Sequence, residues 1–446
     1  MDMSFLEVSQ MLYEHPILYE KFSYKVSYIN ILEYFVQKYS KDDVWANAAL
    51  HLYIDRLLDN ASDDYYNDFN LRRQFREVIG IKFKPFKFFT YRYCLLFDCI
   101  FINAYFDKAK GEKIFSELLT IYHKRYHKNI RRVFNFLYDM NESIDDIDNV
   151  QYMKECWKKN KDFLSIDPIR IMVTANMSAG KSTLLNALVG KKVNKTQNDA
   201  CTAKIHYIMN KPFDDNLCYK WDNILELDAD YQTLMEDNPN NLKGEISVGT
   251  YFRTINSPLK RLLFIDTPGV NSSQDKDHKE ITENTILFLS AKVDLLIYLL
   301  NGENIGTDDE KRHLLFILEN YHGKILFVVN KVDRFRKKED SVSETIESVI
   351  RDLSDIGFET PQVVPISAYA AFLAKMNIFG EKFDEDEQDE FDRMVRKLRK
   401  EEYQFDTYYP YESQKDVQIQ ENDDSHELLL HSGILQLENI IYNLRG

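Results

Sequence analysis

The sequence is poor in cysteine and lacks a long uninterrupted apolar run, and each shortage excludes a class of protein. Its five cysteines are scattered over 446 residues, and only Cys94 and Cys99 lie close together. Because a disulfide framework or a zinc site needs several ligands at short spacing, we expect neither. The most apolar stretch, residues 88–106, is interrupted by Arg92 and Asp98, whose charges are costly at the centre of a bilayer. We therefore predict that this stretch does not span a membrane.

Positive charge is also in short supply. There are 57 lysines and arginines against 72 aspartates and glutamates, which gives a formal net charge of -15. This balance argues against the broad basic face that nucleic acids require, so we expect no nucleic-acid partner. The first residues lack a basic segment followed by an apolar core, and we therefore expect no secretory signal and a cytoplasmic location.

Glycine is nearly absent from residues 1–165, where only Gly80 and Gly111 occur. Apolar residues in this region recur at intervals of three and four, which is the helical period. Examples are Phe22, Val26 and Ile29, and then Ile114, Leu118 and Ile121. We predict an all-α domain over residues 1–165, built as a bundle of about five helices with tyrosines and phenylalanines in its core.

From residue 166 to residue 446, short β-rich apolar runs alternate with helical segments. The candidate buried strands are residues 169–174, 262–265, 295–300, 325–329 and 363–366. Such alternation predicts a mostly parallel sheet with helices on both faces, in which ligands bind beyond the carboxyl ends of the strands. Within this α/β domain, residues 380–425 form a charged insert, predicted as a solvated helix followed by a mobile acidic loop. Residues 432–444 are predicted to form a closing helix.

The loop after the first candidate strand has the composition of a phosphate-binding loop. The predicted nucleotide-binding residues are Ala175, Asn176, Met177, Ser178, Ala179, Gly180, Lys181, Ser182 and Thr183. In a P-loop, backbone amides converge on a phosphate, and the charge of Lys181 bridges the β- and γ-phosphates. The hydroxyl of Ser182 is predicted to bind Mg²⁺. Ala175 stands where the usual motif has glycine, so we expect a modest adjustment of the turn.

Two further loops are candidates for Mg²⁺ and γ-phosphate contacts. The strand 262–265 ends in Asp266, whose carboxylate can hold Mg²⁺ through a water, and the amide of Gly269 can approach the γ-phosphate. Earlier in the chain, Thr202 is the candidate for a mobile threonine that closes over both, with Thr196 as the alternative. The predicted metal residues are thus Ser182, Thr202 and Asp266.

The loop after strand 325–329 is the most discriminating feature, because it predicts the base. Asp333 can accept two hydrogen bonds from guanine, whereas adenine offers neither donor there. Lys331 lays its methylene stem along the base, and Asn330 ties this loop to the phosphate loop. After the next strand, Ser367 and Ala368 supply a backbone N–H for the guanine carbonyl. The expected ligand is therefore GTP or GDP.

The order of these motifs resembles the dynamin superfamily, and most closely its bacterial dynamin-like members. The similar segments are MSAGKS at 177–182, CTA at 201–203, DTPG at 266–269 and NGENIGTDDE at 301–310. In the last segment, Thr307 and Glu310 also form a capping box that starts a helix over 308–319. The resemblance implies a GTPase that hydrolyses GTP to GDP and phosphate with Mg²⁺.

Two departures from the dynamin pattern concern the attacking water. Met177 stands where dynamins proper have glutamine, and Val270 leaves no glutamine beside Gly269. Hydrolysis must then rely on backbone groups, on a second subunit, or on a monovalent cation near Ser178. We expect slow turnover in isolation, activation in a GTP-dependent homodimer, and a catalytic set of Lys181, Ser178, Thr202 and Gly269.

The resemblance leaves the biological partner open. Membrane-remodelling dynamins continue into a long helical stalk with a lipid-binding tip, whereas here the GTPase motifs are followed only by the helix 432–444. A membrane surface or a protein could instead bind the helical region, which would place the protein at the periphery of a membrane. The alternatives are a GTPase acting on a ribosome or RNA partner, and a GTP-gated binding module with little hydrolysis.

Overall fold

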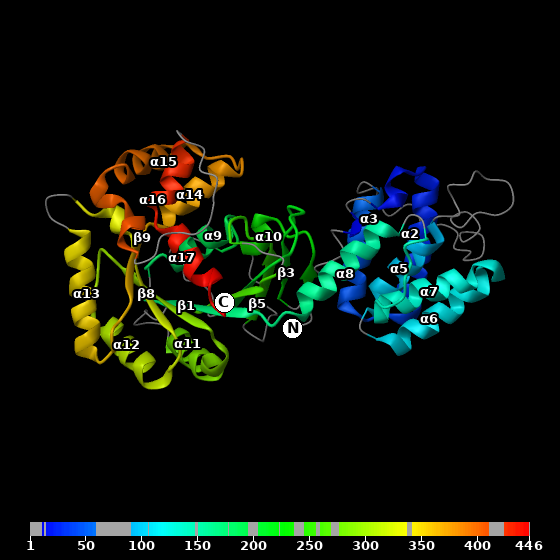
Figure 1. The fold of residues 1–446 in the computed structure, drawn as a ribbon, viewed down its shortest axis with the longest axis horizontal. Helices are drawn as coiled ribbons and strands as arrows, with labels where there is room; N and C mark the ends of the chain where they lie inside the picture. Colours follow the sequence, from blue (N-terminus) through cyan, green and yellow to red (C-terminus); the bar gives the residue numbers. More distant parts are fainter. Residues whose placement is uncertain are drawn as a thin grey trace. The chain divides into compact units, whose positions relative to one another are not determined.

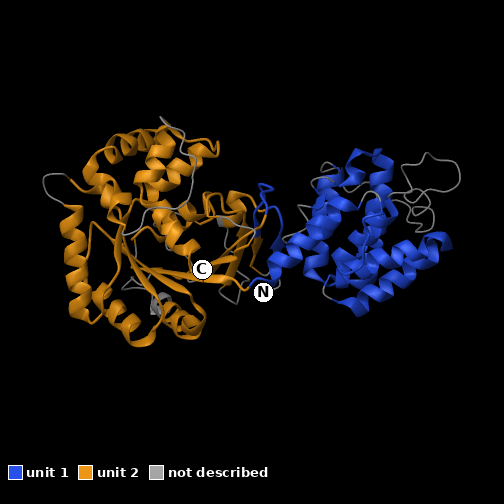
Figure 2. Cartoon of the chain, in the orientation of Figure 1, with its two compact units in different colours: residues 1–166, 213–219, 224–228 blue, residues 167–212, 220–223, 229–446 orange. Residues whose placement is uncertain are grey.

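The computed structural model divides the chain into two compact units (Figure 2). Unit 1 comprises residues 1–166, 213–219 and 224–228, and unit 2 comprises residues 167–212, 220–223 and 229–446. The structure describes residues 11–12, 15–58, 91–105, 107–147, 150–176, 178–194, 204–222, 224–235, 245–255, 259–268, 276–336, 341–409 and 423–445.

The described part of residues 1–166 in unit 1 is helical, as the three- and four-residue spacing predicted. Its described helices are α2 (Phe22–Tyr39), α3 (Val44–Leu58), α5 (Tyr91–Ala104), α6 (Lys108–Ile121), α7 (His127–Asp139) and α8 (Gln151–Ser165), with the 3-10 turns η2 (Pro16–Tyr19) and η5 (Lys124–Tyr126). Every residue of α5 is buried, and α5 contacts α2, α3, α6 and α7. It is therefore the central helix of the bundle, and its burial on all sides agrees with its largely apolar sequence.

The charged residues that interrupt the apolar stretch belong to the interior of this bundle. Asp98 accepts hydrogen bonds from His15 Nε2 at 2.9 Å, Tyr28 Oη at 2.5 Å and Tyr53 Oη at 2.6 Å. A buried carboxylate with three donors is stable inside a protein because its lone pairs are satisfied.

Among the described helices of the chain, none has the length and apolar character needed to cross a membrane.

A nine-stranded sheet has the order β4-β3-β5-β2-β6-β1-β7-β8-β9. Its strands are β1 (Ile169–Ala175), β2 (Ile205–Asn210), β3 (Tyr219–Trp221), β4 (Leu225–Glu226), β5 (Glu245–Thr250), β6 (Leu262–Asp266), β7 (Leu295–Asn301), β8 (Ile325–Asn330) and β9 (Val363–Ile366). The central strand β1 is parallel to both β6 and β7, and β8 and β9 continue in parallel. Only β2 and β6 form an antiparallel pair among the strand pairs with a described register. The five predicted strands are thus confirmed as β1 and β6 to β9.

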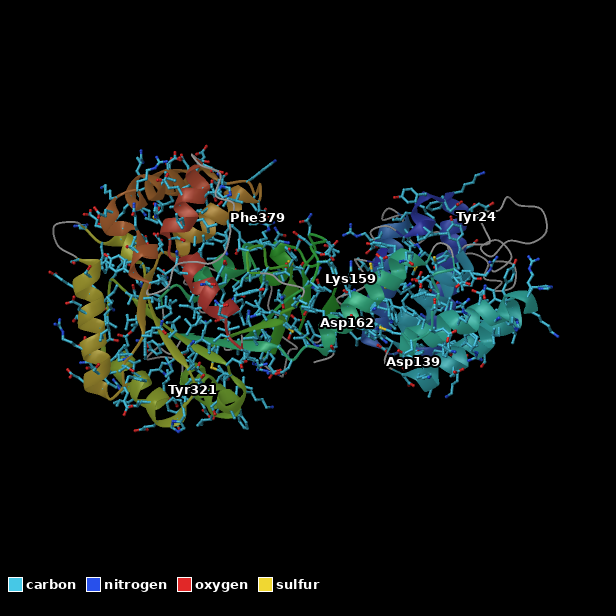
Figure 3. All side chains as sticks on the ribbon, in the orientation of Figure 1. Tyr24, Asp139, Lys159, Asp162, Tyr321 and Phe379 are labelled. Atoms are coloured by element: carbon cyan, nitrogen blue, oxygen red, sulfur yellow. The ribbon has the colours of Figure 1, made fainter. Side chains whose placement is uncertain are left out.

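Helices cover both faces of this sheet (Figure 1). They are α9 (Lys181–Val189), α10 (Tyr231–Met235), α11 (Lys276–Leu289), α12 (Asp308–Asn320), α13 (Val342–Ile356), α14 (Ala368–Ile378), α15 (Glu385–Leu398), α16 (Asp424–His431) and α17 (Ile434–Tyr442), with 3-10 turns η6 (Ser290–Lys292), η7 (Val332–Arg334), η8 (Glu401–Tyr403) and η9 (Phe405–Tyr408). Helices α9, α14 and α17 lie on one side of the sheet and α11 and α12 on the other. Figure 3 shows the same division, with Phe379 after α14 and Tyr321 after α12 on opposite sides.

The structure differs from the sequence-based expectations at strand β5 and at the start of α12. Strand β5 was not predicted, because its run EISVGT is short and contains polar residues that are nevertheless buried. At the start of α12, Thr307 Oγ1 accepts from the amide of Glu310, but the Glu310 carboxylate accepts from the amide of Gly306 at 2.7 Å. The capping box is therefore displaced by one residue, since Gly306 has a φ of 83° that turns its amide toward the helix.

The charged insert contains the amphipathic helix α15. A capping box between Asp384 and Glu387 starts it, and Phe391 and Val395 are among its buried residues. This helix is therefore packed on one face rather than solvated all round. The predicted acidic loop falls largely on residues 410–422, outside the described residues.

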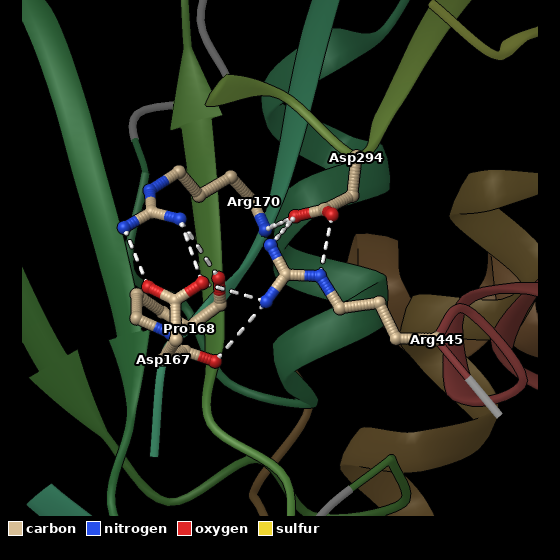
Figure 4. A network of polar contacts seen from close by, with 5 residues as sticks. All are labelled: Asp167, Pro168, Arg170, Asp294 and Arg445. Atoms are coloured by element: carbon tan, nitrogen blue, oxygen red, sulfur yellow. Dashed lines mark hydrogen bonds and ion pairs between the residues drawn. The ribbon is translucent and has the colours of Figure 1, made fainter. Parts of the chain in front are cut away.

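Arg445, near the end of the chain, forms ion pairs with residues just before β1 and β7 (Figure 4). The Arg445 guanidinium pairs with Asp294 at 2.6 Å and with Asp167 at 2.7 Å, and Asp167 also pairs with Arg170 at 3.1 Å. Asp294 in turn accepts from the backbone amide of Arg170 at 2.8 Å. The network lies at the amino ends of the strands, opposite to the edge where the sequence predicts chemistry.

Candidate functional site

The loop between β1 and α9 has the backbone conformation of a phosphate-binding loop. Ser178 and Gly180 have positive φ angles of 60° and 91°. A side chain at Gly180 would be strained by this φ and would also collide with the Asn330 amide. Helix α9 begins at Lys181, and the first amides of a helix have no acceptor within it. The loop therefore presents free amides at the carboxyl end of the central strand.

The P-loop lysine contacts the carboxylate of the neighbouring strand. Lys181 Nζ forms a short ion pair with Asp266 Oδ1, and both side chains are largely buried. The strand register explains the proximity, because Asp266 at the end of β6 pairs with Val173 of β1. The other carboxylate oxygen, Asp266 Oδ2, accepts from Asn194 Nδ2 at 2.8 Å. Two predicted functional residues, 85 positions apart, thus meet at one carboxylate.

The base loop is joined to the phosphate loop through one side chain. Asn330, the last residue of β8, donates from Nδ2 to the backbone carbonyl of Ala179 at 2.8 Å. Its Oδ1 accepts from the backbone amide of Ala368 at 3.0 Å. Asn330 therefore connects the loops after β1, β8 and β9, and the first of these connections is the one that the sequence predicted. The Ala368 amide, predicted to face the guanine carbonyl, is engaged by Asn330 in this structure.

Asp333 is almost fully buried, with 3% of its surface exposed. Burial raises the pKa of its carboxyl above the ordinary value, although a hydrogen bond from the Ser367 side chain opposes the rise. Next to it, Lys331 has a positive φ of 65°, and burial lowers the pKa of its ammonium group. A carboxylate held in a desolvated loop binds paired N–H donors strongly, because water does not compete for it.

Some of the predicted residues lie outside the described residues. These are Met177, Thr202 and its alternative Thr196, and Gly269 with its neighbour Val270. Ala175, Asn176, Ser182 and Thr183 lie in β1, the P-loop and the first turn of α9, as expected from the motif. Sequence reasoning missed Asn186 and Asn194, although an asparagine inside the apolar helix LLNALV is itself an unusual signal.

The residues at this edge fit a divalent cation with oxygen ligands. Ser182 and Asp266 are the side chains that would hold Mg²⁺, and the Asn194 Oδ1 atom is buried without a hydrogen-bond partner. A buried oxygen of this kind is costly unless a donor reaches it, so a hydrated cation suits the position. When bound, Mg²⁺ neutralises charge on the phosphate groups.

A positive-φ P-loop, a carboxylate on the adjacent strand and a buried aspartate in the base loop together define a P-loop GTPase domain. Residues 171–332 match the family model described as Dynamin family. This part of the chain is a dynamin-superfamily GTPase domain, as the order of its motifs indicated.

Known proteins with similar sequences include two kinds of GTPase. A probable transmembrane GTPase, FZO-like and chloroplastic, from Arabidopsis thaliana is 26% identical over 215 residues, which are 47% of this chain and 20% of that protein. The GTPase Era of Haemophilus influenzae strain PittGG is 24% identical over 198 residues, which are 44% of this chain and 48% of Era. The chain therefore spans a fifth of the plant relative and about half of Era.

Solved structures that this chain matches include a bacterial dynamin pair, described as providing a mechanism for the long-range sensing and tethering of membranes. It is 15% identical to this chain, with a TM-score of 0.37, and covers 94% of this chain and 60% of the other. The structure of Era with MgGDPNP and nucleotides of 16S ribosomal RNA is 20% identical, with a TM-score of 0.26, and covers 46% of this chain and 52% of the other.

Proposed function

We propose that this chain is a GTP-hydrolysing switch whose GTPase domain binds GTP and Mg²⁺ at the carboxyl edge of β1, β6 and β8. The observation that carries the proposal is the Asn330 bridge from the phosphate loop to the base loop. Since the bridge holds both loops at one edge, a single nucleotide can contact both. Binding of GTP, measured against ATP by calorimetry, tests it, and equal affinity for the two nucleotides would contradict it.

In this proposal, each predicted residue has a distinct role. The backbone of residues 175–183 holds the α- and β-phosphates, and Lys181 leaves Asp266 to contact the β- and γ-phosphates. Asp333 binds N1–H and the exocyclic amine of guanine, and the Lys331 stem lies along the base. The backbone amides of Ser367 and Ala368 already donate to the Ser432 carbonyl and to Asn330 Oδ1, so they are not assigned to the guanine carbonyl. Adenine would offer the Asp333 carboxylate no donor, and leaving a buried acceptor without a partner costs about 1–3 kcal/mol of binding free energy. The cost is larger when the acceptor is charged.

Hydrolysis transfers the γ-phosphoryl group to water. The Lys181 ammonium stabilises the charge that develops on the phosphoryl oxygens. Ser182 and Asp266 would hold the Mg²⁺, which would neutralise charge on the phosphate groups. Thr202 and Gly269 are proposed to contact the Mg²⁺ site and the γ-phosphate when GTP is bound. GDP and phosphate leave as these contacts are lost.

The attacking water needs a positioning group that the side chains of residues 177 and 270 do not supply, because the side chains of methionine and valine donate no hydrogen bond. We assign activation to a GTP-dependent homodimer, with backbone groups or a monovalent cation near Ser178 as the alternatives. In the dimer mechanism, GTP turnover per subunit rises with protein concentration. A flat profile over a hundredfold range of concentration, in both sodium and potassium buffers, would contradict the dimer.

The partner of the helical unit is proposed to be a membrane surface or a protein. Membrane remodelling is the activity suggested by the dynamin resemblance, and an RNA partner is the alternative suggested by the similarity to Era. Sedimentation with anionic liposomes and binding of a structured RNA, each in GDP and GTP, separate the two. Because the net charge of -15 repels the RNA backbone, we expect RNA binding to be weak.

A further inference from the structure

The Asp266 carboxylate has a partner that the P-loop and switch motifs do not include. Asn194 Nδ2 donates to Asp266 Oδ2 at 2.8 Å, and the Asn194 side chain is buried with 2% of its surface exposed. The donor must be the amide nitrogen, because an ionised carboxylate only accepts hydrogen bonds. The orientation of the Asn194 amide is therefore determined, and its Oδ1 faces away from the carboxylate.

Asn194 is itself held in place by the P-loop helix. Asn186 Oδ1 accepts from the backbone amides of Val193 at 2.9 Å and Asn194 at 2.8 Å, and Asn186 Nδ2 donates to the Asn194 carbonyl at 2.9 Å. Asn186 is fully buried in α9. Three hydrogen bonds thus fix the backbone of Val193 and Asn194 to the helix that starts at Lys181, and a further contact holds the end of that helix. There, Arg253 Nη1 donates to the Gly190 carbonyl at 3.0 Å.

The two oxygens of Asp266 are consequently divided between two partners. Oδ1 contacts Lys181 in this structure, and the proposed function requires Lys181 to move to the phosphates when nucleotide binds. The hydrogen bond from Asn194 Nδ2 to Oδ2 is expected to remain, because Asn186 holds the Asn194 backbone. A carboxylate held at one oxygen presents the other in a constant direction, which favours a metal or a metal-bound water there.

We infer that Asn194 is a positioning residue for the Mg²⁺ site, held by Asn186, and that it acts on the metal through Asp266. The inference rests on the proposed binding of Mg²⁺ and guanine nucleotide. A second observation supports it, since Asn194 Oδ1 is buried and has no hydrogen-bond partner. This acceptor lies on the same amide as the donor to Asp266, where it can accept from a water of a hydrated cation.

Asn194 also marks the point where the predicted threonine loop begins. Residues 195–203, which include Thr196 and Thr202, follow it directly in the sequence. The Asn186–Asn194 pair therefore connects Asp266 and the residue before this segment to the same helix.

The test compares nucleotide affinity with and without the metal. A fluorescent GDP analogue is titrated against the full chain in excess Mg²⁺ and in EDTA, for the wild type and Asn194→Ala. We expect the ratio of the two affinities to fall about tenfold in the variant, the lower end of the loss seen when an outer partner of a metal ligand is removed. Affinity in EDTA should stay unchanged, because the phosphate and base contacts do not involve Asn194.

Asn320→Ala is the matched control, since the Asn320 amide donates to a carbonyl of its own helix, α12, at 2.8 Å. It should leave both affinities unchanged. If Asn194→Ala unfolds, as judged by thermal melting without ligand, Asn194→Ser replaces it, because serine keeps a small polar group that cannot reach Asp266. An unchanged ratio in the folded variant overturns this inference alone. A wild type whose affinity gains nothing from Mg²⁺ removes the proposed metal site and this inference together.

Discussion

Two buried aspartates, one in each unit, differ in how completely their oxygens are satisfied. Asp98 in the helical unit is fully buried and accepts from His15, Tyr28 and Tyr53, all neutral or weakly basic groups from other segments of the bundle. Asp266 in the GTPase unit has 7% of its surface exposed and accepts from Lys181 and Asn194.

The difference separates a structural network from a functional one. The Asp98 network is complete, so adding a ligand would break hydrogen bonds and gain nothing. The Asp266 network contains a lysine with a second predicted partner and an asparagine with an unsatisfied buried oxygen. At Asp266, the unsatisfied oxygen adjoins the contact with Lys181, and the two together favour a ligand.

The largest effect is expected from Asp98→Ala. Removing the carboxylate leaves three buried donors without an acceptor, and breaking a buried charged network costs about 3–5 kcal/mol of unfolding free energy. Urea denaturation followed by tryptophan fluorescence measures it, since Trp45 and Trp157 lie in unit 1. The exposed Asp55→Ala is the control. A loss below 1 kcal/mol would show that the network does not stabilise the bundle.

Lys181→Ala should have the next largest effect, and on binding rather than stability. Without the ammonium group, GTP affinity should fall at least a hundredfold, about 2.7 kcal/mol, because the phosphates lose a buried charge partner. Calorimetric titration with GTP measures it, and Lys311→Ala on the exposed side of α12 serves as control. A variant that binds GTP as tightly as the wild type would disprove the placement of the phosphates.

Asp333→Ala tests the opposite end of the same site. GTP affinity should fall by ten- to a hundredfold, about 1.4–2.7 kcal/mol, while the weaker affinity for ATP should stay the same or rise. Competition of GTP, ATP and ITP against a fluorescent nucleotide gives the ratio. ITP lacks the exocyclic amine, so the wild type should bind it more weakly than GTP, and the variant should not distinguish the two.

The sequence was sufficient to place the ends of the central strands, because P-loop, DTPG and NKVD segments each follow a buried apolar run. It therefore predicted that Lys181, Asp266 and Asn330 share one edge of the sheet. It could not predict β5, whose polar residues are buried only because neighbouring strands cover them. Nor could it pair Asn186 and Asn194 with Asp266, since those contacts depend on how the loop 190–194 returns to α9.

The smallest effect expected is a gain in stability from Asp333→Asn without nucleotide. Burial raises the pKa of the Asp333 carboxyl, so the folded state disfavours its charge. A raised carboxyl pKa contributes stability below the unfolded value near 3.9 and loses it as pH rises through the folded value. At pH 7 the charge is therefore a cost, and the neutral amide should raise the free energy of unfolding by about 1 kcal/mol. The gain should be smaller at pH 4 than at pH 7, because a carboxyl with a raised pKa takes up its proton in the folded state at a higher pH than in the unfolded state. Thermal melting at both pH values measures the difference, and the same variant should lose its preference for GTP.

A variant that is less stable than the wild type at pH 7 would mean that the Ser367 hydrogen bond outweighs desolvation, and Asp333 would then resemble Asp98 rather than Asp266.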